Sequence, residues 1–196
     1  MAIIRNPFSN EIKGRLADII EPVVNRMKKN INVRYVDNAA TFIDAEALKI
    51  REQMDEYDYE KAFDNSNLKD FSKFLEDNKL EVEKDIVDVL KAVFPTSSIE
   101  LSGSFLYPDT GYMGWHTNHD DPCKRLYIVH ADEEKASFFR YVEDGNIITD
   151  FDNKGLTIRE FDVYGTKPYF WHCVGSTCNR FSFGFRIEKE AKVVPT

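Results

Sequence analysis

Two stretches of the sequence contain the side chains best suited to chemistry. Residues 111–125 include His116, Asn118 and two adjacent aspartates, and residues 171–182 include one histidine followed by an arginine and a serine at alternate positions. Mononuclear non-haem iron is held by a few nitrogen and oxygen ligands on one side of the metal, with the other positions open. The two stretches together therefore indicate an iron site next to a pocket for a carboxylate-bearing molecule.

The spacing within each stretch is that of a β-strand, in which residues i and i+2 point to the same side. His116 and Asn118 can then reach one metal ion, and His172 on a distant strand supplies a third ligand. Arg180 and Ser182 have the same spacing and are expected to face the same cavity. A guanidinium and a hydroxyl in that arrangement can hold a carboxylate through charge-assisted hydrogen bonding.

The order of these residues resembles that of the Fe(II)- and 2-oxoglutarate-dependent oxygenases, especially their prolyl-hydroxylase-like branch. The similarity spans residues 107–185. Its elements, in the family's order, are Tyr107-Pro108, Thr110-Gly111-Tyr112, His116-Thr117-Asn118, Arg125, His172 and Arg180-Phe181-Ser182.

The resemblance implies a dioxygenase that hydroxylates an unidentified small-molecule or peptide substrate and releases succinate and CO2. The residues implied as metal ligands and catalytic residues are His116, Asn118 and His172. The implied cofactors are Fe(II) and the cosubstrate 2-oxoglutarate, with ascorbate as an optional addition. The residues expected to bind 2-oxoglutarate are Arg180, Ser182, Tyr107 and Tyr127.

One position departs from the family pattern, because the family's usual aspartate is Asn118 here. An amide oxygen can bind iron but brings no charge, so such a site holds the metal less tightly. Two other ligands stay open: Asp120 on the same strand face, or Asp121 if residues 119–121 form the His-x-Asp element. We favour Asn118, because its histidine follows the Thr-Gly-Tyr turn and keeps the family's nine-residue interval to the next arginine.

Other uses of the same residues remain open. A catalytically inactive jelly roll that binds a sugar or a partner protein fits Asn118, and a cupin-like metalloenzyme without 2-oxoglutarate would leave Arg180 a structural role. A structural zinc site is disfavoured, because no Cys-x-x-Cys pair occurs and Cys173 would point away from its neighbour His172.

Several nearby residues are expected to be structural. We expect His119 and His130 to lie at the surface or behind the ligands. We expect ion pairs at Arg125 and Arg186, and packing beneath a helical layer at Trp115 and Trp171.

The composition is that of an ordinary folded protein with an acidic balance. The 196 residues carry a net charge of −8, so no basic face is expected to follow a nucleic-acid backbone. No apolar run reaches the length of about 18 residues that spans a membrane. Three cysteines without a signal-peptide core favour a reduced compartment. We therefore expect a cytoplasmic protein that binds neither membrane nor nucleic acid, and a homodimer through the N-terminal helices stays open.

Residues 1–95 read as mostly helical. Apolar residues recur every three or four positions from Ile12 to Met27, with Ser9 or Asn10 as the cap and Pro22 expected to kink or split the helix. Further helices are expected after Asp44, carrying Leu48 and Met54, across residues 68–75, and across residues 82–94. Residues 33–36 can form a short strand, and residues 64–67 a loop.

From residue 99 the pattern changes to short aromatic and β-branched segments, as expected of a sandwich or barrel. The eight expected strands lie near residues 99–106, 112–118, 125–131, 137–142, 147–150, 156–162, 168–174 and 180–188. We therefore predict an α+β fold with a mostly β core, a double-stranded β-helix (jelly roll) with an N-terminal helical layer packed on one sheet. The chain would form one domain over residues 1–196, with a support layer at 1–95 and a catalytic core at 96–190.

Overall fold

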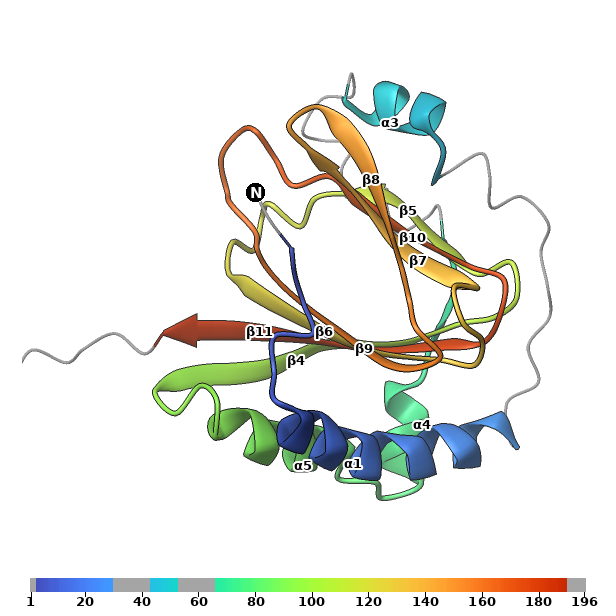
Figure 1. The fold of residues 1–196 in the computed structure, drawn as a ribbon, viewed down its shortest axis with the longest axis vertical. Coiled ribbons are helices and arrows are strands. Elements are labelled where there is room, and N and C mark those ends of the chain that lie inside the picture. The colour runs from blue at the N-terminus through green and yellow to red at the C-terminus, as the bar shows by residue number, and fades with distance from the viewer. Residues whose placement is uncertain (1–2, 30–42, 53–65, 190–196) are drawn as a thin grey trace, which may run out of the picture.

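The computed structural model describes residues 3–29, 43–52 and 66–189, and in these residues two antiparallel β-sheets carry helices on their outer faces (Figure 1). The helices are α1 (Asn10–Lys28), α3 (Ala45–Glu52), α4 (Ser72–Asp77) and α5 (Val82–Lys91). The strands are β1 (Ile4–Arg5), β2 (Ser66–Asn67), β3 (Lys69–Asp70), β4 (Ser97–Tyr107), β5 (Tyr112–His116), β6 (Lys124–Ala131), β7 (Ser137–Glu143), β8 (Asn146–Phe151), β9 (Gly155–Asp162), β10 (His172–Ser176) and β11 (Arg180–Lys189). The expected mostly β core is confirmed, whereas the division into a support layer and a catalytic core stays a prediction.

The six-stranded sheet has the order β1-β9-β6-β11-β4-β3. Its central strand β11 alternates strictly, because successive side chains of a strand point to opposite faces. Phe181, Phe183 and Phe185 pack toward the helices, whereas Arg180 and Ser182 face the other sheet. One strand thus contributes both to the hydrophobic core and to the polar lining of a cavity between the sheets.

The five-stranded sheet has the order β2-β5-β10-β7-β8. Every residue of β5 and β10 is buried, because α3 covers the outer face of these strands and the six-stranded sheet lies opposite their inner face. Trp115 and Trp171 pack there with Leu48 of α3, and the indole of Trp115 donates a hydrogen bond of 2.8 Å to the carbonyl of Asp44. The two tryptophans are therefore packing residues, as predicted, beneath α3.

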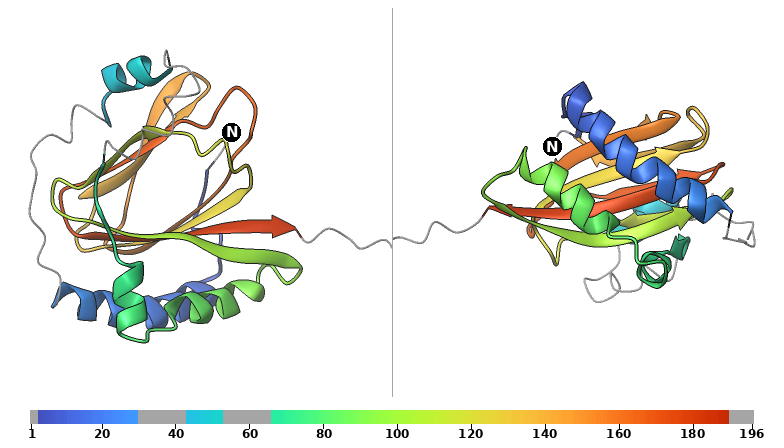
Figure 2. Two further views of the ribbon diagram at one scale, coloured as in Figure 1. Left: turned by 180° about the vertical axis from the view of Figure 1, so that it is seen from behind. Right: turned by 90° about the horizontal axis from the view of Figure 1, so that it is seen from below.

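The helical layer lies on the six-stranded sheet, where α1 and α5 run side by side over its outer face (Figures 1 and 2). The predicted apolar stripe of α1 is confirmed, since its buried residues are Leu16, Ile20, Val23, Val24 and Met27. The hydroxyl of Ser9 caps the helix by accepting a hydrogen bond from the backbone N–H of Ile12 at 3.3 Å. This packing fixes the rear of the sheet whose front face lines the cavity.

Several expected boundaries differ from the structure. Pro22 does not split α1, and it lies on the exposed side of the helix, away from the packed stripe. The strand expected at residues 168–174 begins only at His172, because the N–H of Trp171 bonds to the carbonyl of Tyr169 within the preceding loop. Residues 66–67 form β2 instead of a loop.

Among the other helices and strands predicted in residues 1–95, one helix is confirmed and two have different bounds. The helix expected over residues 68–75 begins at Ser72, and the helix expected to stop at Pro95 ends at Lys91. The helix after Asp44 is confirmed as α3. The predicted strand at residues 33–36 and Met54 lie outside the described residues.

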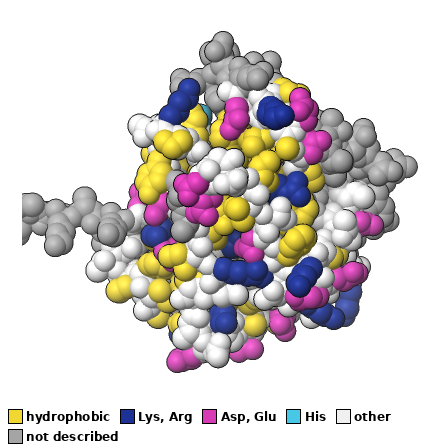
Figure 3. Space-filling view, turned by 45° about the horizontal axis from the view of Figure 1, so that its top comes forward, with side chains coloured by type: hydrophobic (Ala, Val, Ile, Leu, Met, Phe, Trp, Pro, Cys, Tyr) yellow, Lys and Arg dark blue, Asp and Glu magenta, His cyan; other side chains and the backbone are white. Residues whose placement is uncertain are grey.

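The surface carries acidic and basic side chains interspersed with apolar ones on the face seen in Figure 3. None of the described helices combines the length and the apolar character needed to cross a membrane. The expectations on nucleic acid, partners and compartment stay predictions.

Candidate functional site

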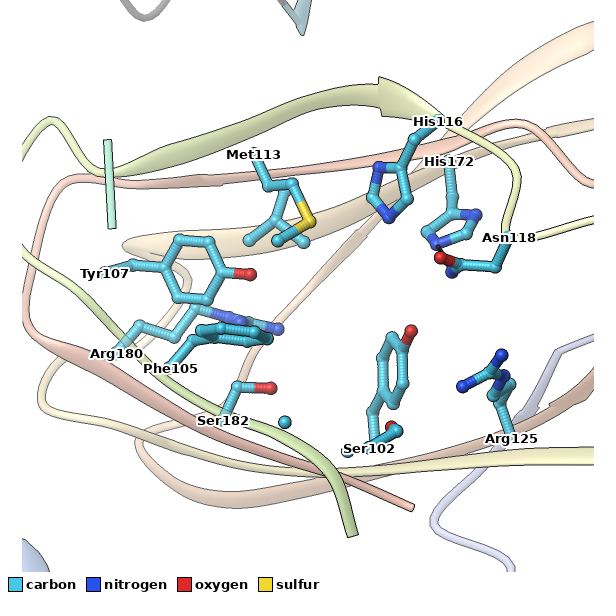
Figure 4. A pocket seen from close by; sticks show the side chains of 14 residues that line it. Ser102, Phe105, Tyr107, Met113, His116, Asn118, Arg125, His172, Arg180 and Ser182 are labelled. Atoms are coloured by element: carbon cyan, nitrogen blue, oxygen red, sulfur yellow. Dashed lines mark hydrogen bonds between the residues drawn. The ribbon is translucent and has the colours of Figure 1, made fainter. Parts of the chain in front are cut away.

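A cavity of about 80 Å³ lies between the two sheets (Figure 4). Its walls come from β4, β5, β6, β10 and β11, so both sheets contribute. The lining residues are Ser102, Gly103, Phe105, Tyr107, Met113, His116, Asn118, Arg125, Tyr127, His172, Val174, Arg180, Ser182 and Gly184. All seven residues predicted to bind metal or cosubstrate are among them.

The two histidines form one end of the cavity. His116 and His172 are direct cross-strand partners on β5 and β10, with ring centroids 4.1 Å apart. In each ring Nδ1 lies within hydrogen-bond distance of a backbone carbonyl, 2.8 Å to Gly114 for His116 and 3.0 Å to Phe170 for His172. Because a carbonyl only accepts, Nδ1 carries the proton and Nε2 keeps its lone pair. This is the tautomer of a metal-binding histidine oriented by a second hydrogen bond.

Burial keeps both rings uncharged. Burial, assisted by the charge of the nearby Arg125, outweighs the hydrogen bond to Gly114 and lowers the pKa of His116 to about 4. Burial, followed by the charge of a protonated His116, lowers the pKa of His172 well below its ordinary value. At neutral pH both imidazoles are therefore neutral, which is the form that binds metal ions.

Asn118 reaches the same end of the cavity by a different route from the one predicted. Strand β5 ends at His116, and Asn118 has the left-handed φ of 54°, a conformation that asparagine tolerates. Its Nδ2 lies 3.2 Å from Nε2 of His172, where the amide donates to the imidazole lone pair. The prediction of a strand through residue 118 is wrong. The side chain nevertheless points at the histidines, because the chain turns there with a hydrogen bond from the N–H of Asp121 to the carbonyl of Asn118.

The two aspartates that stayed open as ligands lie elsewhere. Asp120 is exposed, and Asp121 pairs with Arg125 at 2.7 Å and with Arg186 at 3.1 Å. The predicted ion pairing of both arginines is confirmed. No carboxylate lines the cavity among the described residues, and within residues 3–29, 43–52 and 66–189 no group of three His, Cys, Asp or Glu side chains is placed to hold a metal.

Arg180 forms the other end of the cavity and is 1% exposed. Its Nε donates to a carboxylate oxygen of Asp152 at 2.9 Å, and its guanidinium carbon lies 4.9 Å from the ring centre of Tyr107. Neither Nη1 nor Nη2 has a hydrogen-bond partner within the part of the chain that the structure describes. Buried N–H groups are seldom left without a partner, so this edge of the guanidinium marks a binding position for an acceptor.

Asp152 is the residue that sequence reasoning missed. It is fully buried, accepts hydrogen bonds from Ser137 and Arg159 at 2.5 Å each, and binds Arg180. Burial alone would raise its pKa, but the guanidinium groups of Arg180 and Arg159 outweigh burial and lower the pKa to about 2. Asp152 begins the polar run 152–155 (Asp-Asn-Lys-Gly), which is typical of a turn, and nothing in that run marks a buried charge.

Two tyrosines line the cavity between these ends. Tyr107 lies opposite Arg180 on β4, and Tyr127 packs its ring edge-on against Phe139 and Phe161. Burial raises the pKa of both phenols above the ordinary value, although the positive charge of Arg180 opposes the shift at each. Both hydroxyls therefore stay protonated at neutral pH and can donate hydrogen bonds.

The remaining histidines and cysteines do not join the cavity. Nδ1 of His119 lies 2.8 Å from the hydroxyl of Thr117, and its ring packs on Tyr169. His130 lies beyond the sheet, near Asp132. The thiol of Cys173 points to the outer face of its sheet, toward the carbonyl of Ile43. The described residues thus hold no cluster of the kind that structural zinc requires.

Comparison with known proteins finds no matching family model and no matching curated protein. Among solved structures, a Pseudomonas putida prolyl-4-hydroxylase is similar over 96% of this chain and 93% of its own, with 14% identity and a TM-score of 0.47. An oxidoreductase of the 2OG-Fe(II) oxygenase family from Burkholderia pseudomallei is similar over 56% of this chain and 58% of its own, with 12% identity and a TM-score of 0.38. These values do not assign the chain to a family, so the site is interpreted from its own geometry.

Proposed function

We propose that the protein is an Fe(II)- and 2-oxoglutarate-dependent dioxygenase with a jelly-roll core. The observation that supports this most is the pairing of two chemically different ends in one cavity. One end holds two neutral imidazoles whose Nε2 atoms carry lone pairs, and the other holds a buried guanidinium with an unpartnered edge. A 2-oxo acid with a second carboxylate is the kind of molecule that needs both ends at once.

The residues present fit the metal. His116 and His172 would supply Nε2, and Asn118 would supply Oδ1 after its amide turns over, since the present orientation places Nδ2 near His172. A half turn of the amide exchanges Nδ2 and Oδ1, so the turned amide fits the same side-chain position. Two imidazoles and one carboxylate are the usual donor set of non-haem Fe(II) sites with open positions; here an amide oxygen would take the place of the carboxylate without its charge.

The residues at the far end fit the cosubstrate. Arg180 would bind the distal carboxylate through Nη1 and Nη2, with Ser182 on the same strand face. Tyr107 and Tyr127 would donate hydrogen bonds to cosubstrate oxygens. When bound, Fe(II) and 2-oxoglutarate would supply the oxidising chemistry, in which one atom of dioxygen goes to succinate with loss of CO2 and the other goes to the substrate. The protein's own contribution is to bind, to orient and to exclude water.

Thermal unfolding with and without ligands tests the proposal. The full chain is loaded with Mn(II), which does not turn over, and titrated with 2-oxoglutarate. A ligand at a hundred times its Kd stabilises a folded protein by about 2.7 kcal/mol, which is a rise in Tm of roughly 5–10 °C at this chain length. We expect that rise in the original protein and none in Arg180→Met, and succinate release once Fe(II), ascorbate and dioxygen are supplied.

Arg186→Met is the matched control. Arg186 lies on the same strand as Arg180, but it pairs with Glu100 and Asp121 at the surface and does not line the cavity. It should keep the ligand-dependent rise in Tm. The absence of any 2-oxoglutarate effect on the Mn(II)-loaded original protein would sink the proposal.

A second candidate is a binding module that has lost catalysis. The lack of any carboxylate among the described lining residues favours it, because the metal then gains no charge from the protein. This candidate predicts that the purified protein takes up no Fe(II) or Mn(II), with or without 2-oxoglutarate. It also predicts that Asn118→Asp restores metal uptake.

A further inference from the structure

We propose that Asp152 is a positioning residue for the cosubstrate pocket: it holds Arg180 by Nε so that both Nη atoms face the cavity and receive a carboxylate side by side. The inference rests on the proposed function and deepens it, because it explains how one arginine can select a dicarboxylic 2-oxo acid.

The hydrogen bond to Asp152 uses the one edge of the guanidinium that the ligand does not need. A guanidinium carries five N–H groups in a rigid plane, and Asp152 takes the one on Nε at 2.9 Å. The four others belong to Nη1 and Nη2, which have no partner among the described residues. The outer edge is therefore left as a fork whose two donors match the two oxygens of a carboxylate. The ring of Tyr107 supports one flat face of the same plane.

Asp152 is itself held on every side. Its Oδ1 accepts from Arg159 and its Oδ2 accepts from the hydroxyl of Ser137, both at 2.5 Å. Its backbone N–H donates to the carbonyl of Ser137, and its carbonyl accepts from the N–H of Lys135, both at 2.9 Å. Ser137 belongs to the five-stranded sheet and Arg159 to the six-stranded sheet. The carboxylate that orients Arg180 thus lies at a junction of the two sheets, and its contacts there prevent it from moving together with Arg180.

The surrounding charges explain why the Arg180 guanidinium can keep its buried position and orientation when no ligand is bound. Arg180 and Arg159 are balanced by Asp152 and by Asp150, which accepts from Nε of Arg159 at 2.7 Å. Arg180 is therefore not an isolated buried charge, because a buried carboxylate opposes it directly. An incoming carboxylate then finds its partner already fixed, which removes the cost of ordering a long side chain upon binding.

Asp150 provides a matched control for Asp152. It accepts from Arg159, as Asp152 does, and lies in the same run of chain, but its other oxygen binds Arg5, and it makes no hydrogen bond to Arg180 within the described residues. A general weakening of the cluster should therefore appear in both Asp150→Asn and Asp152→Asn. A change in the orientation of the Arg180 guanidinium should appear only in Asp152→Asn.

The test measures two affinities on the Mn(II)-loaded full chain by calorimetry. The probes are 2-oxoglutarate and 2-oxobutyrate, which shares the 2-oxo acid group but lacks the second carboxylate. We expect Asp152→Asn to weaken the binding of 2-oxoglutarate about tenfold or more, in line with the loss of an oriented, charge-assisted contact. The Kd of 2-oxobutyrate should stay within about twofold, and Asp150→Asn should leave the ratio of the two affinities unchanged.

Ser137→Ala keeps the inference testable if Asp152→Asn does not fold. It removes one hydrogen bond to Oδ2 of Asp152 and keeps every charge. It should therefore weaken the binding of 2-oxoglutarate by about two- to fivefold and leave the binding of 2-oxobutyrate unchanged. An equal loss for both probes, or equal losses in Asp152→Asn and Asp150→Asn, would show a purely structural role. Failure of the original protein to bind either 2-oxo acid would overturn the proposed function. If the original protein binds both and Asp152→Asn has the same two Kd values, only this inference is overturned.

Discussion

The two ends of the cavity are built in different ways. Arg180 lies at the start of a ten-residue strand and is fixed by buried opposite charges. His116 and His172 lie at the ends of five-residue strands and are fixed by hydrogen bonds from Nδ1 to backbone carbonyls. The position of the guanidinium therefore depends on charge, whereas the position of the imidazoles depends on the main chain.

The lack of charge at the imidazole end affects how a metal and a cosubstrate would share the cavity. At the imidazole end the two rings and Asn118 are all neutral at pH 7, so a divalent metal gains no compensating charge from these side chains. A dianionic 2-oxo acid would supply that charge and satisfy Arg180 at the same time. We therefore expect metal and 2-oxoglutarate to strengthen each other's binding, and this coupling is reciprocal by thermodynamic necessity.

The largest effect is expected from breaking the charges behind Arg180. Arg159→Met leaves Asp150 and Asp152 without their shared cation in a buried position, and breaking such a pair costs about 3–5 kcal/mol. Urea unfolding measures the loss. Lys124→Met is the control, because Lys124 pairs with Glu160 on the same sheet but is 30% exposed, and such pairs contribute about 1 kcal/mol or less. Equal losses of unfolding free energy in the two variants would contradict the view that buried charges hold the Arg180 end of the cavity.

The second effect tests the imidazole end. His172→Ala removes one of two neutral nitrogen donors, and we expect the affinity for Mn(II) to fall by about a hundredfold, or about 2.7 kcal/mol. Since the strand on which it lies is held by backbone pairing on both sides, the fold should remain, and circular dichroism checks that. His119→Ala, whose ring lies outside the cavity lining, should bind metal as before. Unchanged metal affinity in His172→Ala would remove that residue from the site.

The third effect is acid sensitivity, which should begin at the guanidinium end. The pKa of Asp152 is about 2 in the folded protein and 3.8 for an ordinary aspartate, so the unfolded chain binds its proton first as the pH falls. This carboxylate then contributes about 2 kcal/mol of stability above pH 4, and the contribution is lost as the pH falls from about 4 to 2. Asp152→Asn should flatten this part of the profile of unfolding free energy against pH. An identical profile in the variant would contradict the assignment.

The same contrast shows what could be predicted from the sequence. The strand β11 was predicted within a residue, because its apolar and polar residues alternate over its whole length and both faces are buried against different partners. The lining positions of Arg180 and Ser182 follow from that alternation. Where local pattern and burial coincide, the sequence predicts which way a side chain points.

Other features depend on contacts that no local pattern encodes. The direct pairing of His116 with His172 is a matter of register between strands far apart in the chain. The strands β1 to β3 have two residues each and exist through their partners, as with Ile4 opposite Glu160. Asp152 looks like a turn residue, and its role appears only when three strands bring Ser137, Arg159 and Arg180 around it.

The smallest effect, and the most direct on the neutral end, is expected from Asn118→Asp. A carboxylate in place of the amide would add one negative charge beside the imidazoles, and we expect Mn(II) to bind about tenfold more tightly, or about 1.4 kcal/mol. The metal-free variant should lose a few degrees in Tm, because the hydrogen bond from Nδ2 to His172 is replaced by two facing acceptors.

The coupling between the ligands separates this effect from a general change of charge. With Asp at position 118 the metal no longer depends on the cosubstrate for compensation, so the gain in Mn(II) affinity caused by 2-oxoglutarate should shrink. Asn146→Asp adds the same charge at the exposed turn between β7 and β8 and should leave both quantities unchanged. If Asn118→Asp leaves the metal affinity and the coupling as they were, then residue 118 does not face the metal, and the neutral end of the cavity must be built from other donors.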